Sequence, residues 1–339
     1  MLRSLFPDQE PRLTAQYDQA LTAIPDGRSK QRGIAVGSRT ADAMITAREN
    51  DGAFGDQTWP VGTRPGQWRP TPPTYASDGA WVASLKPFLI PSASMFRTSG
   101  PPALTSKRYA RDFNEVKTVG AANSTVRTAD QTQAAIWWHD RHLAEWEIKR
   151  QLVTTQRLNT LRTARMFVMV GMAEADATIA CYNEKAAWSF WRPVSAIQLA
   201  DTDGNPETAA DPGWTPLLVT PPHPDYTSGH TCFTGASMSA LQHFFGRDDL
   251  LQRLQRRLGH HPALPQLLRG DRRGRERPRV GRHPHAHGRR GRRQDRPAGD
   301  RLHGHPPLQE KGSLTPERLA GAVTQERSRV NRGADGRAV

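Results

Sequence analysis

The sequence predicts an all-α domain followed by a long basic tail. Apolar residues recur with the helical period of about 3.6 along most of residues 1–249, where strand-like alternation is scarce. The composition then changes abruptly near residue 246. These observations divide the chain into a helical domain, residues 1–249, and a tail, residues 250–339.

Five segments of the domain have the periodicity and end signals of helices, and a proline-rich stretch separates two groups of them. Residues 50–102 are rich in Gly, Pro, Trp and Thr, and the prolines exclude a long helix there. The tryptophans of this stretch predict an ordered loop that packs over the helices. The expected helices cover residues 11–24, 30–48, 130–154, 158–183 and 228–245.

The tail has a composition that opposes folding. After residue 246 there are 23 Lys and Arg against 10 Asp and Glu, whereas the first 246 residues carry 24 and 23. The aromatic residues (9 Trp, 5 Tyr and 10 Phe) all precede residue 247, and the tail has neither Ile nor Met. Such a segment cannot bury enough apolar surface to offset its ordering entropy, so we expect the tail to be disordered.

Targeting and cysteine signals are few. No apolar run approaches the roughly 20 residues of a membrane span, so we expect a soluble chain. No leader peptide is visible. The first residues already have a helical pattern, which is compatible with a translation start further upstream. The two cysteines, Cys181 and Cys232, provide neither a disulfide framework nor a zinc site, and we expect them to be free and buried.

A Ser-Gly-His triplet opens the last expected helix. Ser228 is a favourable N-cap, and the amides of Gly229 and His230 then point out of the helix start. The partial positive charge of such a terminus favours an oxyanion. An ordinary capping serine beside a surface histidine gives the same three letters, so the triplet alone does not define a site.

A second motif supplies cations. Lys185 is separated by six residues from Arg192-Pro193. Two cations beside a helix N-terminus form a cage for a tetrahedral or trigonal-bipyramidal oxyanion, whereas each alone would suit a solvated surface or a salt bridge. His223 and Asp225, shortly before the triplet, are candidate supporting groups.

Together the segments "KAAWSFWRP" and "TSGH" resemble a family signature, that of the vanadium-dependent haloperoxidases and type 2 phosphatidic acid phosphatases. The signature is Lys-x6-Arg-Pro followed by Pro-Ser-Gly-His, and Thr227 replaces its proline. The linker between the motifs is similar to the soluble bacterial haloperoxidase-like branch. The resemblance implies a helical bundle of the haloperoxidase and acid-phosphatase type.

The resemblance also implies a role for each of five residues, called the donor set below: Lys185, Arg192, Ser228, Gly229 and His230. The two cations would bind the equatorial oxygens of the vanadate cofactor, Ser228 and Gly229 would add a hydroxyl and an amide donor, and His230 would be the general acid/base. Lys185 would also polarise hydrogen peroxide for attack by halide. The implied activity is a haloperoxidase acting on peroxide and a halide or small organic substrate; the alternative is a phosphatase acting on phosphate monoesters, with phosphate in place of vanadate.

The third family motif, Ser-Arg-x5-His-x3-Asp, contributes the histidine that binds vanadium, and it does not occur in the tail. No residue of this chain is therefore assigned as a metal ligand. A one-nucleotide shift of the tail permits a peptide with aromatic residues, helical periodicity, and an arginine six residues before a histidine with an aspartate beyond. We interpret the tail as the product of a frameshift near residues 249–251 and expect the chain as written to be inactive.

Two other interpretations concern basic and histidine-rich segments. A nucleic-acid-binding arm would require salt-sensitive binding, and the tail lacks aromatic residues for base stacking, which disfavours this alternative. His139 and His142 share a helix without an evident third ligand, so packing is favoured over a metal site. The tail histidines His283, His285 and His287 could form a weak metal site, but the frameshift interpretation makes them out-of-frame residues.

Overall fold

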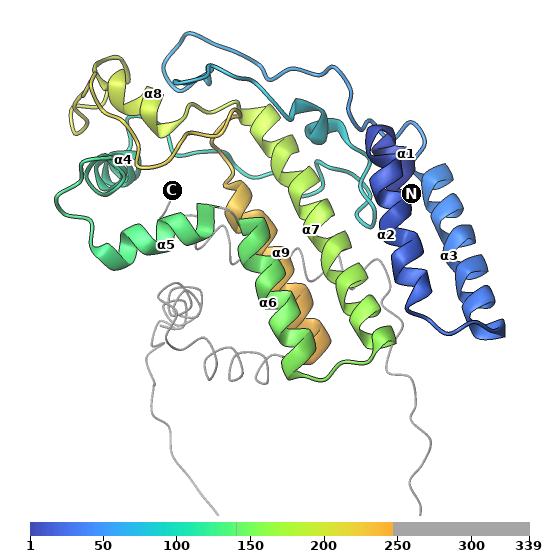
Figure 1. The fold of residues 1–339 in the computed structure, drawn as a ribbon. Coiled ribbons are helices and arrows are strands. Elements are labelled where there is room, and N and C mark those ends of the chain that lie inside the picture. Colours follow the sequence, from blue (N-terminus) through green and yellow to red (C-terminus); the bar gives the residue numbers. More distant parts are fainter. Residues whose placement is uncertain (140, 247–339) are drawn as a thin grey trace, which may run out of the picture.

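The computed structural model describes residues 1–139 and 141–246, and this part of the chain is helical (Figure 1). Within these ranges there is no β-strand, and the extended pairing consists of two isolated bridges, Gln67 with Phe190 and Ala121 with Pro216. The all-α prediction is therefore confirmed. The tail and the boundary at residue 249 lie outside the described residues, so both stay predictions.

The described helices follow one another along the chain without any strand between them. They are α1 (Leu2–Leu5), η1 (Pro7–Gln9), α2 (Glu10–Thr22), α3 (Arg28–Ala47), η2 (Ala80–Ser84), α4 (Lys107–Val119), α5 (Ala129–His139), α6 (Arg141–Thr155), α7 (Thr160–Trp188), α8 (Pro193–Gln198), η3 (Ala200–Thr202) and α9 (Gly229–Phe245).

The main core lies between α6, α7 and α9, which run side by side in Figure 1. The long helix α7 contributes Met166 and Val170, both fully buried, and α9 contributes Leu241. Burial of a side chain of this size contributes about 1.5–3 kcal/mol. This packing fixes the position of α9, and with it the Ser-Gly-His triplet, relative to α7.

A second core holds the other end of α7 in place. Trp191 and Trp214 pack with residues of α4 and α8. The proline-rich stretch crosses the last turns of α7, where Trp59 and Trp68 are buried against Tyr182. The prediction of an ordered loop over the helices is confirmed, and the tryptophans are the reason that this loop can be ordered.

Three details differ from the sequence prediction. Helix α4 was not predicted, although Ser106 caps it by accepting a hydrogen bond from the Tyr109 amide at 3.2 Å, and Tyr109 and Phe113 bury one face. The segment predicted as one helix over residues 130–154 is covered by α5 and α6, which run in different directions in Figure 1 on either side of residue 140, itself outside the described residues. Helix α7 continues to Trp188, five residues beyond the predicted end, so Lys185 lies in its last turn.

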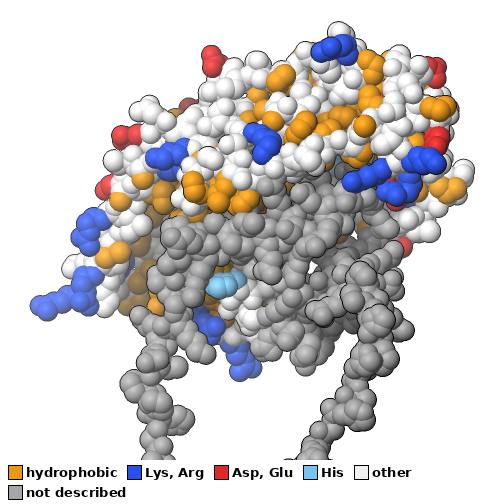
Figure 2. Space-filling view, turned by 180° about the vertical axis from the view of Figure 1, so that it is seen from behind, with side chains coloured by type: hydrophobic (Ala, Val, Ile, Leu, Met, Phe, Trp, Pro, Cys, Tyr) orange, Lys and Arg blue, Asp and Glu red, His pale blue; other side chains and the backbone are white. Residues whose placement is uncertain are grey.

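The surface of the described part is mixed in character. On the face seen in Figure 2, groups of hydrophobic side chains alternate with scattered cationic and anionic side chains. Helices α1, α2 and α3 contain no buried residue. Among the helices of residues 1–139 and 141–246, none is both long and apolar enough to cross a membrane.

A group of polar side chains interrupts the main core. Glu145 on α6 is 1% exposed and accepts a hydrogen bond from the Thr234 hydroxyl on α9 at 2.6 Å. Beside it, Lys149 and Glu174 form a buried ion pair at 2.8 Å. Burial raises the pKa of Glu145 to about 7; the Thr234 hydrogen bond opposes the rise and the Glu174 charge adds to it.

The pH dependence of stability should report this buried carboxyl group. Because the folded-state pKa of Glu145 lies above its unfolded value, its protonated form stabilises the fold at low pH, and this contribution is lost as the pH rises through about 7. The free energy of unfolding in urea should fall by about 2–3 kcal/mol between about pH 5 and pH 8. Glu145→Gln should flatten this dependence, whereas the exposed Glu147→Gln on the same helix should preserve it. Equal pH dependence in both variants would contradict the assignment.

Candidate functional site

The two cations of the donor set lie on either side of a short connection. Helix α7 ends at Trp188, and Ser189 takes a left-handed conformation with φ of 38° that turns the chain away from the helix axis. Trp191 is buried, and Arg192 is the N-cap of α8, followed by Pro193 at the first helical position. The connection therefore brings the last turn of α7 and the start of α8 to one region.

The Ser-Gly-His triplet forms the predicted start of α9. Ser228 is the N-cap, and its hydroxyl oxygen accepts a hydrogen bond from the Thr231 amide at 3.4 Å. Gly229 and His230 occupy the first two helical positions, whose amides have no partner within a helix. A larger residue would fit at position 229, because a Cβ atom at Gly229 would meet no atom within 4 Å.

Lys185 points to the loop that precedes α9. Its Nζ donates hydrogen bonds to the carbonyl oxygens of Pro224 at 2.6 Å and Asp225 at 2.7 Å, and the side chain is 1% exposed. Burial lowers the pKa of Lys185 to about 8; a negative charge on Cys181 opposes this, and the Arg192 charge adds to it. The ammonium group is therefore held by backbone oxygens.

Arg192 contacts the same loop through its whole guanidinium group. Its Nε donates to the carbonyl oxygen of His223 at 2.6 Å, Nη1 forms an ion pair with Asp225 at 3.0 Å, and Nη2 lies 2.8 Å from Nδ1 of His223. Burial lowers the pKa of Arg192, and the Asp225 charge opposes that shift. His223 and Asp225, expected as supporting groups, do contact the donor set.

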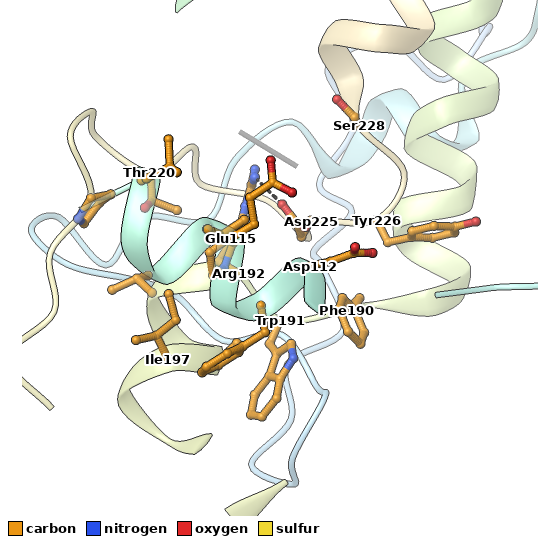
Figure 3. A pocket seen from close by; sticks show the side chains of 18 of the residues that line it. Asp112, Glu115, Phe190, Trp191, Arg192, Ile197, Thr220, Asp225, Tyr226 and Ser228 are labelled. Carbon is orange, nitrogen blue, oxygen red and sulfur yellow. Dashed lines mark hydrogen bonds and ion pairs between the residues drawn. The ribbon is translucent and has the colours of Figure 1, made fainter. Parts of the chain in front are cut away.

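A cavity of about 780 Å³ opens beside these residues (Figure 3). Arg192, Ser228 and His230 are among its lining residues, and Figure 3 shows the Arg192–Asp225 ion pair with Ser228 at the start of α9. Lys185 and Gly229 are not among the lining residues. The structure thus brings three members of the donor set to the cavity and places the Lys185 ammonium behind the loop of residues 223–225.

The charges around the cavity are balanced. Among the described lining residues, three arginines (Arg108, Arg127 and Arg192) accompany three carboxylates (Asp112, Glu115 and Asp225). Any local excess of positive charge therefore depends on Lys185 and on the N-terminus of α9. The groups of the donor set are all hydrogen-bond donors: a guanidinium, an ammonium, a hydroxyl, an imidazole and the amides at the start of α9. Donors of these types can bind an oxyanion, and the Asp225 carboxylate competes with it.

The other histidines considered as metal ligands give no metal site in the described part of the chain. His139 lines the cavity at the end of α5. The side chain of His142 and the tail histidines lie outside the described residues. Within the described part, no group of three or more His, Cys, Asp or Glu residues is placed to hold a metal ion.

Comparison with known proteins connects this arrangement to a family. The family model of the second helical-bundle domain of vanadium chloroperoxidase matches residues 165–270, a range that includes both motifs. The matched segment of this chain is therefore similar to the vanadium haloperoxidases. The vanadium chloroperoxidase of Curvularia inaequalis is 30% identical over 152 residues, which cover 37% of this chain and 24% of that protein. The match thus spans about a quarter of that relative's length.

One solved haloperoxidase structure shares the fold. The first bacterial vanadium-dependent iodoperoxidase to be crystallised has a TM-score of 0.58 at 24% identity, and the match covers 70% of this chain and 60% of that chain. An apo-type bacterial vanadium-dependent chloroperoxidase has a TM-score of 0.41 at 18% identity, covering 57% and 47%. The iodoperoxidase match supports the expected helical bundle of the haloperoxidase type.

Replacement of Asp225 should test the buried ion pair. Asp225→Asn should lower the free energy of unfolding by about 3 kcal/mol, because it leaves the Arg192 guanidinium buried without a carboxylate. A matched control is Asp112→Asn, since Asp112 also lies 3.0 Å from an arginine, Arg111, but that pair is more exposed (65% and 31%, against 8% and 21%). The control should cost at most about 1 kcal/mol. Urea unfolding of both variants measures the difference; equal losses would show that burial of the Asp225 pair is not decisive.

Proposed function

We propose that the donor set is a vanadate site of the haloperoxidase type. The observation that carries this proposal is the convergence of Arg192, Ser228 and His230 on one cavity, with Lys185 fixed directly behind its loop. The position of both family motifs within the matched range supports it. Bound vanadate would supply the activation of hydrogen peroxide for the oxidation of a halide or small organic substrate.

Each member of the donor set has a distinct role in this proposal. Arg192 and Lys185 hold the negative charge of the oxyanion, and Ser228 and the Gly229 amide donate hydrogen bonds to it. His230 in the first turn of α9 serves as general acid/base, because an imidazole gains and loses protons near neutrality. The apolar part of the cavity wall, which includes Trp191 and Phe190, limits the access of water.

Binding of an oxyanion has a cost that the structure identifies. The Arg192 guanidinium already contacts Asp225 and His223, and Lys185 already donates to two carbonyl oxygens. An oxyanion therefore competes with the Asp225 carboxylate for Arg192. We infer that the loop of residues 223–225 adjusts its contacts when the site is loaded.

Substitution of Ser228 should test vanadate binding without any activity assay. In calorimetric titration of the full chain with orthovanadate, Ser228→Ala should weaken binding about tenfold, because a hydroxyl donor to a charged group is lost. Ser106→Ala is the matched control: it removes the N-cap of α4, with the same cost of about 1 kcal/mol in stability, but lies outside the donor set. Equal weakening in both variants, or no binding by the original chain, would contradict the site.

The same titration also addresses the phosphatase alternative. Phosphate has the geometry of vanadate in its tetrahedral form and should compete for the same donors. Turnover of a phosphate monoester without vanadate or peroxide would favour the phosphatase. Halide oxidation that depends on both would favour the haloperoxidase.

The proposed activity also depends on the third motif, which the written tail lacks. We propose that a shift of reading frame removed it. Because the family match continues to residue 270, past the expected shift near residues 249–251, the DNA to be verified spans codons 245–270.

Activity assays should separate the two forms of the chain. With vanadate, peroxide and bromide, the chain as written should show no oxidation above the protein-free rate, because a residue that binds vanadium is missing. A chain with the shifted frame restored should be active, and the same chain with His230→Ala should lose most of its rate. Vanadate-dependent turnover by the chain as written, with its DNA sequence verified, would contradict the frameshift.

A further inference from the structure

The two cysteines of the chain lie together at the junction of α7 and α9. Cys181 is buried on α7, one helical turn before Lys185, and Cys232 closes the first turn of α9 and is partly buried. Neither cysteine forms a disulfide bond, and the expected burial holds fully for Cys181 but only in part for Cys232. Neither is among the cavity lining residues, so the pair is separate from the cavity surface.

One hydroxyl group bridges the two sulfur atoms. The Oγ1 atom of Thr227 lies 3.1 Å from Sγ of Cys181 and 3.7 Å from Sγ of Cys232. The Cys181 thiol also lies 3.6 Å from the Thr227 carbonyl oxygen, to which it donates. Thr227 stands where the family signature has proline, a residue without a hydroxyl. The departure from the signature therefore coincides with the thiol pair.

The thiols also interact with each other and with Lys185. A hydrogen bond with the Cys181 thiol, followed by burial, raises the pKa of Cys232 well above its ordinary value. The charge of Lys185 has the opposite effect on Cys232, and a negative charge on Cys181 raises the pKa of Lys185. Lys185 is therefore the cation that favours the thiolate form at this pair, against the effect of burial.

We propose that Cys181 and Cys232 form a redox-active pair that hydrogen peroxide converts into a disulfide between α7 and α9. Because both sulfur atoms lie within 3.7 Å of one hydroxyl oxygen, rearrangement of the two side chains can bring them to the S–S bond length of about 2.05 Å. This inference concerns the thiols alone and does not depend on vanadate binding.

The chemistry needs one equivalent of peroxide. The Cys181 thiolate, beside Lys185, attacks one peroxide oxygen; the O–O bond breaks, and the leaving hydroxide takes up a proton to become water. The Cys232 sulfur then attacks the sulfenic sulfur, the S–S bond forms, and the S–O bond breaks with release of a second water. Two thiols and one peroxide thus give one disulfide and two waters, and two electrons pass from sulfur to oxygen.

The disulfide would restrict the relative positions of the donor-set residues. It joins a residue one turn before Lys185 to a residue two positions after His230, and it closes a loop that contains Arg192 and the loop of residues 223–225. Oxidation would therefore fix the start of α9 relative to the last turns of α7. Closing a loop of this length should also stabilise the folded chain.

The test is peroxide treatment of the full chain followed by thiol counting and intact mass. One equivalent of peroxide should remove both titratable thiols and lower the mass by about 2 Da, and dithiothreitol should reverse both changes. Proteolytic mapping should find residues 181 and 232 in one linked peptide. The Tm of the oxidised chain should rise by at least about 5 °C.

Cys181→Ser and Cys232→Ser serve as controls, since neither can form the bond. Peroxide should leave both variants without the loss of about 2 Da and without the increase in Tm. The proposal is overturned if the original chain keeps two titratable thiols after treatment, or if its disulfide links two chains. It is equally overturned if the mass increases through oxygen addition with no linked peptide. These outcomes are independent of the vanadate titration.

Discussion

The need to partner two buried cations constrains the whole region around the candidate site. Lys185 is 1% exposed and Arg192 is 7% exposed, and an unpartnered buried charge is strongly destabilising. The loop of residues 223–225 provides the partners: two carbonyl oxygens for Lys185, and a carbonyl, a carboxylate and an imidazole for Arg192. Because that loop leads directly into α9, these contacts tie the end of α7, the start of α8 and the start of α9 together.

The sequence predicts the helices that form the main core, although their apolar residues are spread around each helix and not confined to one face. Helix α9 begins where the Ser228 cap predicts it, and the two motifs together, though neither alone, predicted that Lys185 and Arg192 lie near its start. Helix α4 carried the same kind of signal, with Ser106 before apolar residues at helical spacing, and could have been found.

The direction of the Lys185 side chain could not be predicted from spacing. Both a lysine that faces a cavity and one that binds backbone carbonyls satisfy the same motif, and the choice depends on the path of a loop forty residues later in the chain. The pairing of Arg192 with Asp225 also depends on the path of this loop and could not be predicted from spacing. His223 and Asp225 could be proposed as supporting groups from their proximity to the triplet, but only tertiary structure shows which cation they contact.

Charge balance indicates what a third motif would add to the proposed site. The Asp225 carboxylate neutralises the charge of Arg192. Burial lowers the pKa of Lys185 to about 8, so the positive charge of Lys185 declines as the pH rises through that value. The remaining attraction for an oxyanion comes from the N-terminus of α9, which is equivalent to about half a charge. A further arginine and histidine, as the family signature has them, would add positive charge and favour the oxyanion over the Asp225 carboxylate. Without them, an oxyanion has to draw Arg192 away from Asp225 with the help of Lys185 and the start of α9 alone.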